Sequence, residues 1–198
     1  MAQITADPPL SKGGRTRQAI LDVAVAQFAT TGLRGTSMPG IGRELALTPS
    51  ALYAYFPTKQ ALFDAAVDFD VAGLIADAVP DILAGSFDGN FGRVFQRLLE
   101  ALPAHALARR VLSGEEIRGP ERLVMLPAEI RLQGGIATAL RRGQKDGTIR
   151  SDIDPELMAV GLEAIVEALL IGILQTGGAT DPNVSRGVLA VLHAALYP

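Results

Sequence analysis

Nine consecutive residues decide the fold of the first part of this chain: Ala51-Leu52-Tyr53-Ala54-Tyr55-Phe56-Pro57-Thr58-Lys59. They join the end of one predicted helix to the start of another. The first helix is short, from about residue 48 to 54, with Thr48 as a capping residue and Pro49 in the first turn, where a missing N–H costs nothing. The second opens at Thr58 and continues to about residue 79, because apolar residues recur along it with a helical period.

Two further helices precede this stretch. One is predicted over about residues 12–31 and ends at Gly32, a residue suited to a helix C-terminus. The other is short, over about residues 37–45, with Thr36 as its N-cap and Pro39 in its first turn. Only about three residues separate the two short helices, which is typical of a helix-turn-helix unit. In such a unit the second helix can enter the major groove of DNA while the first crosses the backbone.

The second short helix has a small, nearly uncharged outer face. With Leu52 turned to the core, Ser50 and Ala54 point outward. Tyr53 lies on one flank and Ala51 on the other. Small side chains let a helix lie deep in a groove, and alanine methyl groups can contact thymine methyl groups. The alternative is a serine- and alanine-rich surface helix without a partner.

Charge is distributed unevenly along the chain. Residues 1–60 carry a net charge of +3, whereas the remaining 138 residues carry −6. A basic N-terminal segment followed by an acidic remainder is consistent with an N-terminal segment that binds a polyanion, although so small a charge excess can also arise by chance. Lys12, Arg15 and Arg17 form a basic lead-in that we expect to follow the DNA backbone as part of an N-terminal arm.

A specific resemblance covers about residues 15–63. The residues that carry it are Arg17, Ile20, Leu21, Ala24, Phe28, Gly32, Thr36, Ser37, Ile41, Leu45, Ser50, Ala51, Leu52, Tyr53, Tyr55, Phe56, Lys59 and Leu62. In order and spacing this set resembles the N-terminal domain of the TetR family of bacterial transcriptional regulators. The resemblance implies that Tyr53 and Tyr55 contact phosphates or base edges.

Other predicted DNA contacts follow from position. Lys59, in the first turn of the long helix, is unfavourable for the helix dipole alone but suits a phosphate docked against the free N–H groups. Arg43 projects away from the buried side of its helix and could reach a phosphate, or could be simply solvated. The predicted DNA-binding set is Thr36, Ser37, Arg43, Thr48, Pro49, Ser50, Ala51, Tyr53, Ala54, Tyr55 and Lys59.

Four residues depart from the family pattern. Pro39 stands where a polar or basic residue is frequent. Gly40 and Gly42 each weaken a short helix by about 1 kcal/mol relative to alanine, although Gly42 permits close helix packing. Ala46 stands in the turn where glycine is common, so a positive φ there would be mildly strained.

The rest of the chain continues the helical pattern. Further helices are predicted near residues 90–101, 103–113, 120–145, 154–176 and 182–196, which makes an all-α protein of about nine helices. We expect a helix-turn-helix domain over residues 1–60, with a flexible arm over about 1–11, and an effector-binding and dimerisation domain over 61–198. The chain has no cysteine and only two histidines, and it carries no Walker loop or nucleophile motif, so neither a catalytic site nor a metal nor a cofactor is expected.

The last two predicted helices are apolar on more than one face, which predicts burial on several sides. They could complete the monomer core or form a subunit interface, and the resemblance implies a four-helix bundle between two subunits. The predicted interface residues are Val160, Gly161, Ala164, Ala168, Val188 and Leu192.

The sequence indicates effector-binding residues less specifically than DNA-binding residues. Glu163 and Glu167, four residues apart in an apolar helix, could line a cavity or form a narrow solvated stripe. Met125 could wall a pocket, because methionine adapts to varied ligands. His105 is a further candidate, although a lone histidine is more often structural. Asp154 is predicted to start a helix rather than to bind a metal, because Pro155 follows it.

These features predict a homodimeric, cytoplasmic, ligand-responsive regulator. We expect a repressor that leaves a palindromic DNA operator when a small, largely apolar molecule binds the C-terminal domain. No membrane span is expected, because Glu163 and Glu167 interrupt the most apolar stretch. The alternatives are an all-α small-molecule-binding protein or enzyme with an incidental basic head, and a structural partner-binding bundle.

Overall fold

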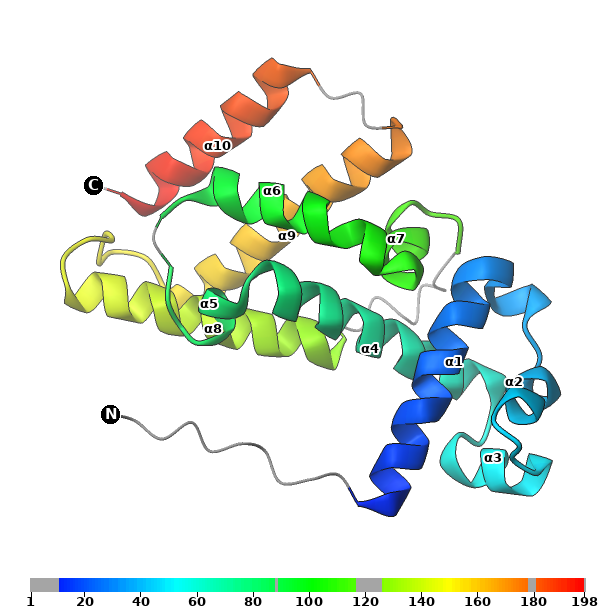
Figure 1. The fold of residues 1–198 in the computed structure, drawn as a ribbon. Helices are drawn as coiled ribbons and strands as arrows, with labels where there is room; N and C mark the ends of the chain where they lie inside the picture. Colours follow the sequence, from blue (N-terminus) through cyan, green and yellow to red (C-terminus); the bar gives the residue numbers. More distant parts are fainter. Residues whose placement is uncertain (1–10, 88, 117–125, 178–180, 198) are drawn as a thin grey trace. The chain divides into compact units, whose positions relative to one another are not determined.

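The computed structural model describes residues 11–87, 89–116, 126–177 and 181–197. Within these residues all regular secondary structure is helical, so the all-α prediction is confirmed. The chain divides into two compact units, Met1–Ala66 and Val67–Pro198, called below the N-terminal and the C-terminal unit. Figure 1 shows the helices in chain order.

The N-terminal unit holds α1 (Lys12–Gly35), α2 (Met38–Glu44), α3 (Pro49–Tyr55) and the start of α4 (Lys59–Ala78). Its core is the apolar face that the periodicity predicts, and Phe28 and Phe63 meet there edge to face with ring centroids 5.0 Å apart. The fully buried members of this core include Ile20, Ala24, Phe28, Ile41, Leu52 and Leu62.

Helix α1 ends differently from the prediction. Gly32 has φ 70° and ψ 178°, so the regular helix stops there as expected, but the chain resumes a turn of helix up to Gly35. Thr36 is not the N-cap of α2, because its hydroxyl donates back to the Gly32 carbonyl at 2.9 Å. Ser37 takes that role, and its Oγ accepts from the Gly40 N–H at 3.1 Å.

The turn between α2 and α3 has the predicted strain. Ala46 has φ 52°, and it is the one non-glycine residue with positive φ in the described part of the chain. Helix α3 begins as predicted, because Thr48 Oγ1 accepts from the Ala51 N–H at 3.2 Å. Thr58 caps α4 in the same way through the Ala61 N–H at 3.0 Å.

The C-terminal unit contains the end of α4 and all later helices. They are α5 (Pro80–Leu83), α6 (Phe91–Ala101), the 3-10 helix η1 (Leu102–Ala104), α7 (Ala106–Leu112), α8 (Pro127–Lys145), α9 (Pro155–Gln175) and α10 (Pro182–Leu196). Two helices depart from the predictions: the short α5 was not predicted, and the helix predicted at 103–113 is divided at His105 into η1 and α7. Residues 120–125, where another predicted helix begins, lie outside the described residues.

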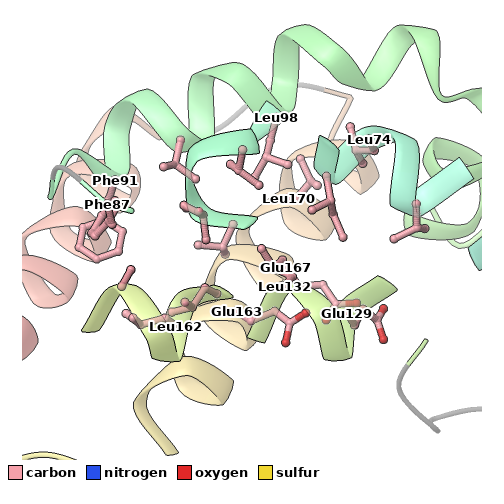
Figure 2. A pocket seen from close by; sticks show the side chains of 18 of the residues that line it. Leu74, Phe87, Phe91, Leu98, Glu129, Leu132, Leu162, Glu163, Glu167 and Leu170 are labelled. Carbon is pink, nitrogen blue, oxygen red and sulfur yellow. The ribbon is translucent and has the colours of Figure 1, made fainter. Parts of the chain in front are cut away.

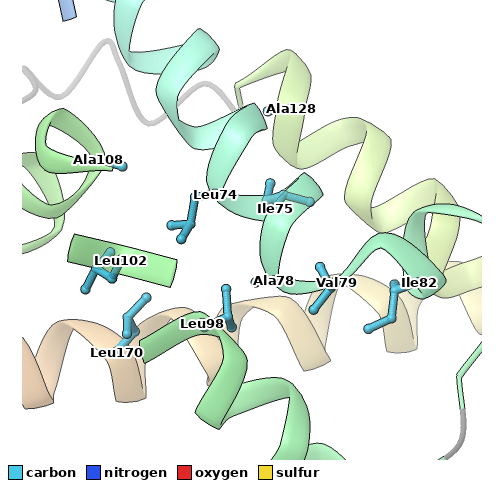
Figure 3. Packing of buried hydrophobic residues seen from close by; sticks show 10 residues of the cluster. All are labelled: Leu74, Ile75, Ala78, Val79, Ile82, Leu98, Leu102, Ala108, Ala128 and Leu170. Carbon is cyan, nitrogen blue, oxygen red and sulfur yellow. The ribbon is translucent and has the colours of Figure 1, made fainter. Parts of the chain in front are cut away.

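Helices of this unit surround a cavity, which Figure 2 shows from close by. Beside it lies a buried apolar cluster that draws side chains from α4 to α9 (Figure 3). Leu74 and Ile75 of α4, Leu98 of α6 and Leu170 of α9 belong to this cluster. A second cluster joins α8, α9 and α10 through Leu140, Leu162, Leu192 and Leu196. The two clusters hold the cavity-lining helices in place by burying apolar surface.

Polar anchors fix α4 to its neighbours inside the C-terminal unit. Asp68 Oδ1 accepts from the Ala128 N–H at the start of α8, and Asp70 Oδ2 accepts from the Ala108 N–H in the first turn of α7, both at 2.8 Å. Free N–H groups at a helix start favour a carboxylate. These two bonds therefore stabilise the starts of α7 and α8 on the side of α4.

Helix α9 is long and apolar enough, by length and composition, to cross a membrane, with a mean hydropathy of 2.2 over its most apolar window. Only 22% of that window is buried inside the subunit. Such a helix is weak evidence for a membrane, because a helix that packs against other protein surfaces can pass the same test. The apolar exterior of α9 nevertheless requires an explanation, since single subunits rarely expose large apolar patches.

Candidate nucleic-acid interface and effector cavity

Helix α3 has the orientation that the sequence predicts. Leu52 is 1% exposed and Phe56, directly after the helix, is 3% exposed, so both anchor α3 to the core. Tyr53 on the opposite side is 47% exposed. The small residues of the outer face, Thr48, Pro49, Ser50 and Ala54, are exposed as well, and Ala51 is partly exposed. The helix thus presents one aromatic hydroxyl among small side chains.

Tyr55 lies differently from Tyr53. It is partly buried, and its hydroxyl lies close to Gly13 in the first turn of α1, where a β-carbon would be 3.9 Å from the oxygen. Tyr55 therefore links the end of α3 to the start of α1.

Glycine allows α2 to approach α3 closely. A β-carbon on Gly42 would lie 3.2 Å from the Leu47 carbonyl oxygen and 3.7 Å from Leu52 Cδ2. The first distance is tighter than ordinary van der Waals contact, so even alanine would push the turn outward by a few tenths of an ångström. The close packing predicted for Gly42 is therefore present, and it fixes the position of α3.

Several hydroxyl and basic side chains lie around this unit. Ser37 and Thr48 use their oxygens to accept from backbone N–H groups, and each hydroxyl still has a proton that it can donate to a phosphate. Arg43 is exposed in the last turn of α2. Thr36 must be removed from the predicted DNA contacts, because it is 3% exposed and its hydroxyl bonds to Thr31 at 2.8 Å as well as to Gly32.

Lys59 has a structural contact that the sequence did not indicate. Its Nζ donates to the Thr36 carbonyl oxygen at 3.1 Å and is partly buried. This bond ties the start of α4 to the link between α1 and α2. An ammonium group has three donors, so the bond leaves Lys59 able to meet a phosphate while it also stabilises the fold.

The basic lead-in is part of α1. Lys12 and Arg15 line a solvent-open hollow of about 790 Å³ together with Leu45 and Leu47 of the turn between α2 and α3. The guanidinium of Arg17 lies over the Phe56 ring, 5.0 Å from its centroid. Arg17 therefore packs on the core of the unit by a cation–π contact. Residues 1–10, which make up nearly all of the predicted arm, lie outside the described residues.

The cavity of the C-terminal unit has about 1030 Å³ of space free of protein atoms, including the part open to solvent. Its walls come from α4 to α9 and from Phe87 between α5 and α6, and they are apolar except for three carboxylates, Glu129, Glu163 and Glu167. The structure thus brings the two predicted glutamates, Glu163 and Glu167, to the cavity and adds Glu129.

The carboxylates are held by neighbours. Glu129 Oε2 accepts from the Leu126 N–H at 2.6 Å at the start of α8, and Glu163 accepts from the side-chain amide of Gln133. The pKa of Glu163 is raised to about 7, chiefly by burial and to a smaller extent by the negative charges of Glu129 and Glu167, while the Gln133 hydrogen bond acts to lower it. Glu163 therefore titrates near neutral pH.

The other two predicted effector residues are not in this lining. Met125 lies outside the described residues. His105 is not isolated, because Nδ1 lies 3.1 Å from Asp70 Oδ1 and Nε2 lies 3.2 Å from Asp77 Oδ2. It also lies against Gly73, where a β-carbon would be 2.7 Å from its ring. His105 is a structural link between α4 and the junction of η1 with α7, so its assignment as an effector contact is withdrawn.

An apolar exterior marks α9 and α10. Leu157 is 76% exposed, Val160 46% and Val191 63%. Gly161, Ala164 and Ala168 lie on the exposed side of α9, whereas Val188 is partly buried. Leu192 is 1% exposed and belongs to a buried core cluster, so it cannot face a partner, whereas its neighbour Val191 is exposed.

The described residues hold no group of three or more histidine, cysteine, aspartate or glutamate side chains that could bind a metal ion. Asp154 has the predicted role, because its Oδ1 accepts from the Leu157 N–H at 2.8 Å and caps α9.

Sequence reasoning missed most of the cavity lining. The aromatic and aliphatic walls, such as Phe87, Phe91 and Leu132, come from helices that are far apart in the sequence. Within each helix these residues follow an ordinary core pattern. The one available signal was the pair Glu163 and Glu167 inside an apolar helix.

Comparisons with known proteins agree on one family. A family model described as bacterial regulatory proteins, tetR family, matches residues 20–66. The transcriptional repressor KstR2 of Rhodococcus jostii (strain RHA1) is 31% identical over 163 residues, which cover 77% of this chain and 76% of the relative. The transcriptional regulator UidR of Escherichia coli (strain K12) is 26% identical over 183 residues, which cover 91% of this chain and 93% of the relative.

A solved structure agrees in fold. The crystal structure of a TetR-family transcriptional regulator from Mesorhizobium loti matches with a TM-score of 0.67 at 20% identity, covering 96% of this chain and 100% of that chain. At that identity the likeness concerns the fold alone. It extends over both units of the chain.

Proposed function

Because this chain belongs to the TetR family of bacterial regulatory proteins, we propose that it is a homodimeric repressor released from its operator by a small, largely apolar effector. The relatives are transcriptional regulators, and the chain is a transcriptional regulator of the same kind. The proposal adds the sign of regulation, the palindromic operator and the sites. We also propose that the chain has no catalytic role and acts in the cytoplasm.

The N-terminal unit is the proposed DNA-binding domain, and α3 is its recognition helix. The observation that carries the proposal is the exposed face of α3, with Tyr53 47% exposed opposite the buried Leu52. Tyr53, Ser50 and Ala54 would meet base edges in the major groove. Ser37, Thr48, Tyr55, Arg43 and Lys59 are the proposed phosphate contacts, and Lys12 and Arg15 would meet the backbone beside them.

The exposed apolar side of α9 supports the dimer. Gly161, Ala164 and Ala168 allow a second helix to approach closely, while Leu157 and Val160 supply apolar area. On α10, Val184 (51% exposed) and Val191 (63% exposed) extend the same kind of surface. Pairing of these helices with their two-fold mates would remove apolar side chains from water.

The cavity is the proposed effector site. An effector that prefers one dimer conformation shifts the population toward it. If that conformation holds the two recognition helices at a spacing other than the roughly 34–36 Å of successive major grooves, the operator is released. By reciprocity, bound operator then weakens effector binding by the same factor.

Operator binding and its salt dependence test the proposal. We expect the protein to bind the DNA upstream of its own gene more tightly than a random duplex of equal length. Arg43→Ala should weaken binding to both duplexes and lower the slope of log affinity against log salt by about one contact. Arg142→Ala is the matched control, because Arg142 is also an exposed arginine in the last turn of a helix but lies in the C-terminal unit.

The control should leave both affinity and slope unchanged. Equal, salt-independent retention of the two duplexes would contradict the proposed function. Salt-dependent binding with an unchanged slope for Arg43→Ala would remove only the phosphate contact of that arginine.

A further inference from the structure

The proposed recognition helix lacks the side chains that most often read bases. Residues 45–58, which are all the residues between α2 and α4, contain no charged residue and neither asparagine nor glutamine. Arginine and lysine recognise guanine, and asparagine and glutamine recognise adenine, by paired hydrogen bonds in the major groove. Helix α3 can make none of these paired contacts, so it must read sequence by other means.

The outer face of α3 consists mostly of carbon. Leu52 and Phe56 are buried and hold the opposite side of the helix to the core. Pro49, Tyr53 and Ala54 are exposed. They offer a pyrrolidine ring, an aromatic ring and a methyl group. A base edge in the groove would therefore meet a surface that is largely apolar.

The hydroxyl groups on this face discriminate poorly between bases. A hydroxyl both donates and accepts hydrogen bonds, so those of Thr48, Ser50 and Tyr53 can pair with groups on any base edge. Thr48 also uses its oxygen to accept from the Ala51 N–H at 3.2 Å. The hydroxyls can hold the helix in the groove, but they leave the choice of base to the apolar contacts.

Thymine is the base that suits an apolar face. It presents its C5-methyl group in the major groove, where the other bases present hydrogen-bond donors and acceptors. A donor or acceptor placed against alanine would lose water without gaining a hydrogen bond, which is unfavourable. A methyl group against Ala54 or the Tyr53 ring would instead be removed from water, which is favourable.

The packing of α3 permits the close approach that such contacts need. Apolar groups are in contact when their heavy atoms lie within about 4.0–4.5 Å. The short side chains of Ser50 and Ala54 do not hold the helix away from the bases. On the inner side, a β-carbon on Gly42 would lie only 3.2 Å from the Leu47 carbonyl oxygen. This tight contact between α2 and the turn keeps α3 at a fixed position.

We propose that α3 recognises its operator half-site through the methyl groups of thymine, with Ala54 and the Tyr53 ring as the contacting surfaces. This inference rests on the proposed function of α3 as the recognition helix. Arg43 and Lys59 lie outside α3 and remain the proposed phosphate contacts, which position the helix without reading sequence. The choice of base under α3 then depends on apolar contact.

Parallel selections from two DNA libraries test the proposal. Both libraries contain random duplexes of equal length, one amplified with thymidine triphosphate and the other with deoxyuridine triphosphate. Uracil lacks the thymine methyl group but keeps every hydrogen-bonding group. We expect the full chain to enrich sequences with thymine at fixed positions of each half-site from the first library. Enrichment from the uracil library should be much weaker.

Affinities for the enriched duplex, measured by fluorescence anisotropy, give the size of the effect. Replacing one contacted thymine by uracil removes one methyl group from the interface, so binding should weaken about fourfold. The same change in both half-sites of a palindrome should weaken it about fifteenfold. At such a position 5-methylcytosine, paired with guanine, keeps the methyl group and changes the hydrogen-bonding groups. It should therefore bind more tightly than cytosine by about the same fourfold factor.

Variants locate the contact on α3. Ala54→Gly removes a methyl group from the outer face, and Tyr53→Ala removes the ring. Each should reduce the difference between thymine and uracil to less than about twofold at the position that the residue contacts. Ala26→Gly is the control, because Ala26 is exposed on α1, outside the proposed DNA contacts, and loses a similar helix propensity. It should keep the full thymine preference, and a melting curve of each variant checks folding.

The outcomes separate this inference from the proposed function. Sequence-specific binding of equal strength to thymine and uracil duplexes would overturn the thymine readout while leaving α3 as a DNA-binding helix. A thymine preference that both α3 variants retain in full would also overturn it, because a difference in duplex shape would then be the cause. Absence of enrichment from the thymine library would contradict the proposed DNA-binding function itself.

Discussion

Helices α3 and α9 use opposite patterns of exposure. Helix α3 buries Leu52 at 1% exposure and presents small and polar side chains to the outside. Helix α9 exposes Leu157 at 76% and Val160 at 46%, while its charged Glu163 is partly buried in the wall of a cavity. A soluble helix normally places its charges in water and its large apolar residues inside. The inverted pattern of α9 therefore indicates that its surroundings in the free subunit are incomplete.

The two patterns suggest different partners. The outer face of α3 needs no cover in water, and its small side chains suit close approach to a groove. The outer face of α9 is stabilised only when another apolar surface covers it. The contrast supports our proposal that α3 binds the polar ligand, DNA, and that α9 binds the apolar partner, a second subunit.

The largest expected effect comes from a charge on the α9 face. Ala168→Arg would place an unpaired charge inside the proposed dimer interface, at a cost of several kcal/mol. We expect a monomer or an aggregate by analytical ultracentrifugation. Ala76→Arg is the control, because Ala76 is exposed on α4 and outside the proposed interface.

If Ala168→Arg forms a dimer of normal stability, the exposed side of α9 is not the dimer interface. The exposed side of α9 would then need another explanation than a second subunit. Loss of the dimer in both variants would point to a general effect of the added charge instead.

A smaller effect is expected from the carboxylate that α9 turns to the cavity. The folded-state pKa of Glu163 lies above its ordinary value of 4.5, at about 7, so the folded protein binds more protons than the unfolded chain between these two values. Stability therefore falls as pH rises through this window and is constant above it. Glu163→Gln should remove this dependence.

The size of that effect is modest. Because Glu163 is only half buried and water screens it, we expect Glu163→Gln to stabilise the protein by about 1 kcal/mol at pH 8 relative to its effect at pH 4. Urea melts at the two pH values measure the difference. An equal effect at both values would show that the carboxyl is not perturbed by the cavity.

The smallest expected effect concerns the turn that sets α3. Ala46 has φ 52°, a conformation that costs alanine roughly 1 kcal/mol and glycine almost nothing. Glycine loses more chain entropy on folding, so Ala46→Gly should stabilise by only about 0.5 kcal/mol. A thermal melt tests this, and a lower melting temperature would show that the turn is not strained.

The sequence predicts the fold and the α3 face well because both depend on local pattern. The period of Leu52 and Phe56 against Tyr53 is sufficient to orient that helix. Thr36 and Ser37 are adjacent hydroxyl residues, and only the exact path of the chain after Gly32 decides which of them caps α2. The residue types alone do not determine that path.

Contacts across the C-terminal unit could not be predicted in the same way. His105 meets Asp70 and Asp77, which lie 35 and 28 residues earlier in the chain, so no local spacing reveals them. Leu192 and Val191 are neighbours in an apolar helix, and only the packed structure shows that the first is buried and the second exposed. Local patterns cannot distinguish a core face from an interface when both are apolar.

The most direct test of the account is the operator affinity of Tyr53→Ala, measured by fluorescence anisotropy beside a thermal melt. Tyr53 lies on the exposed side of α3, so its removal should cost about 1–3 kcal/mol of operator binding if the ring reaches a base edge. The melting temperature and the dimer should stay unchanged. A melting temperature lowered by many degrees, with normal operator affinity in the protein that remains folded, would contradict the assignment of this face to DNA.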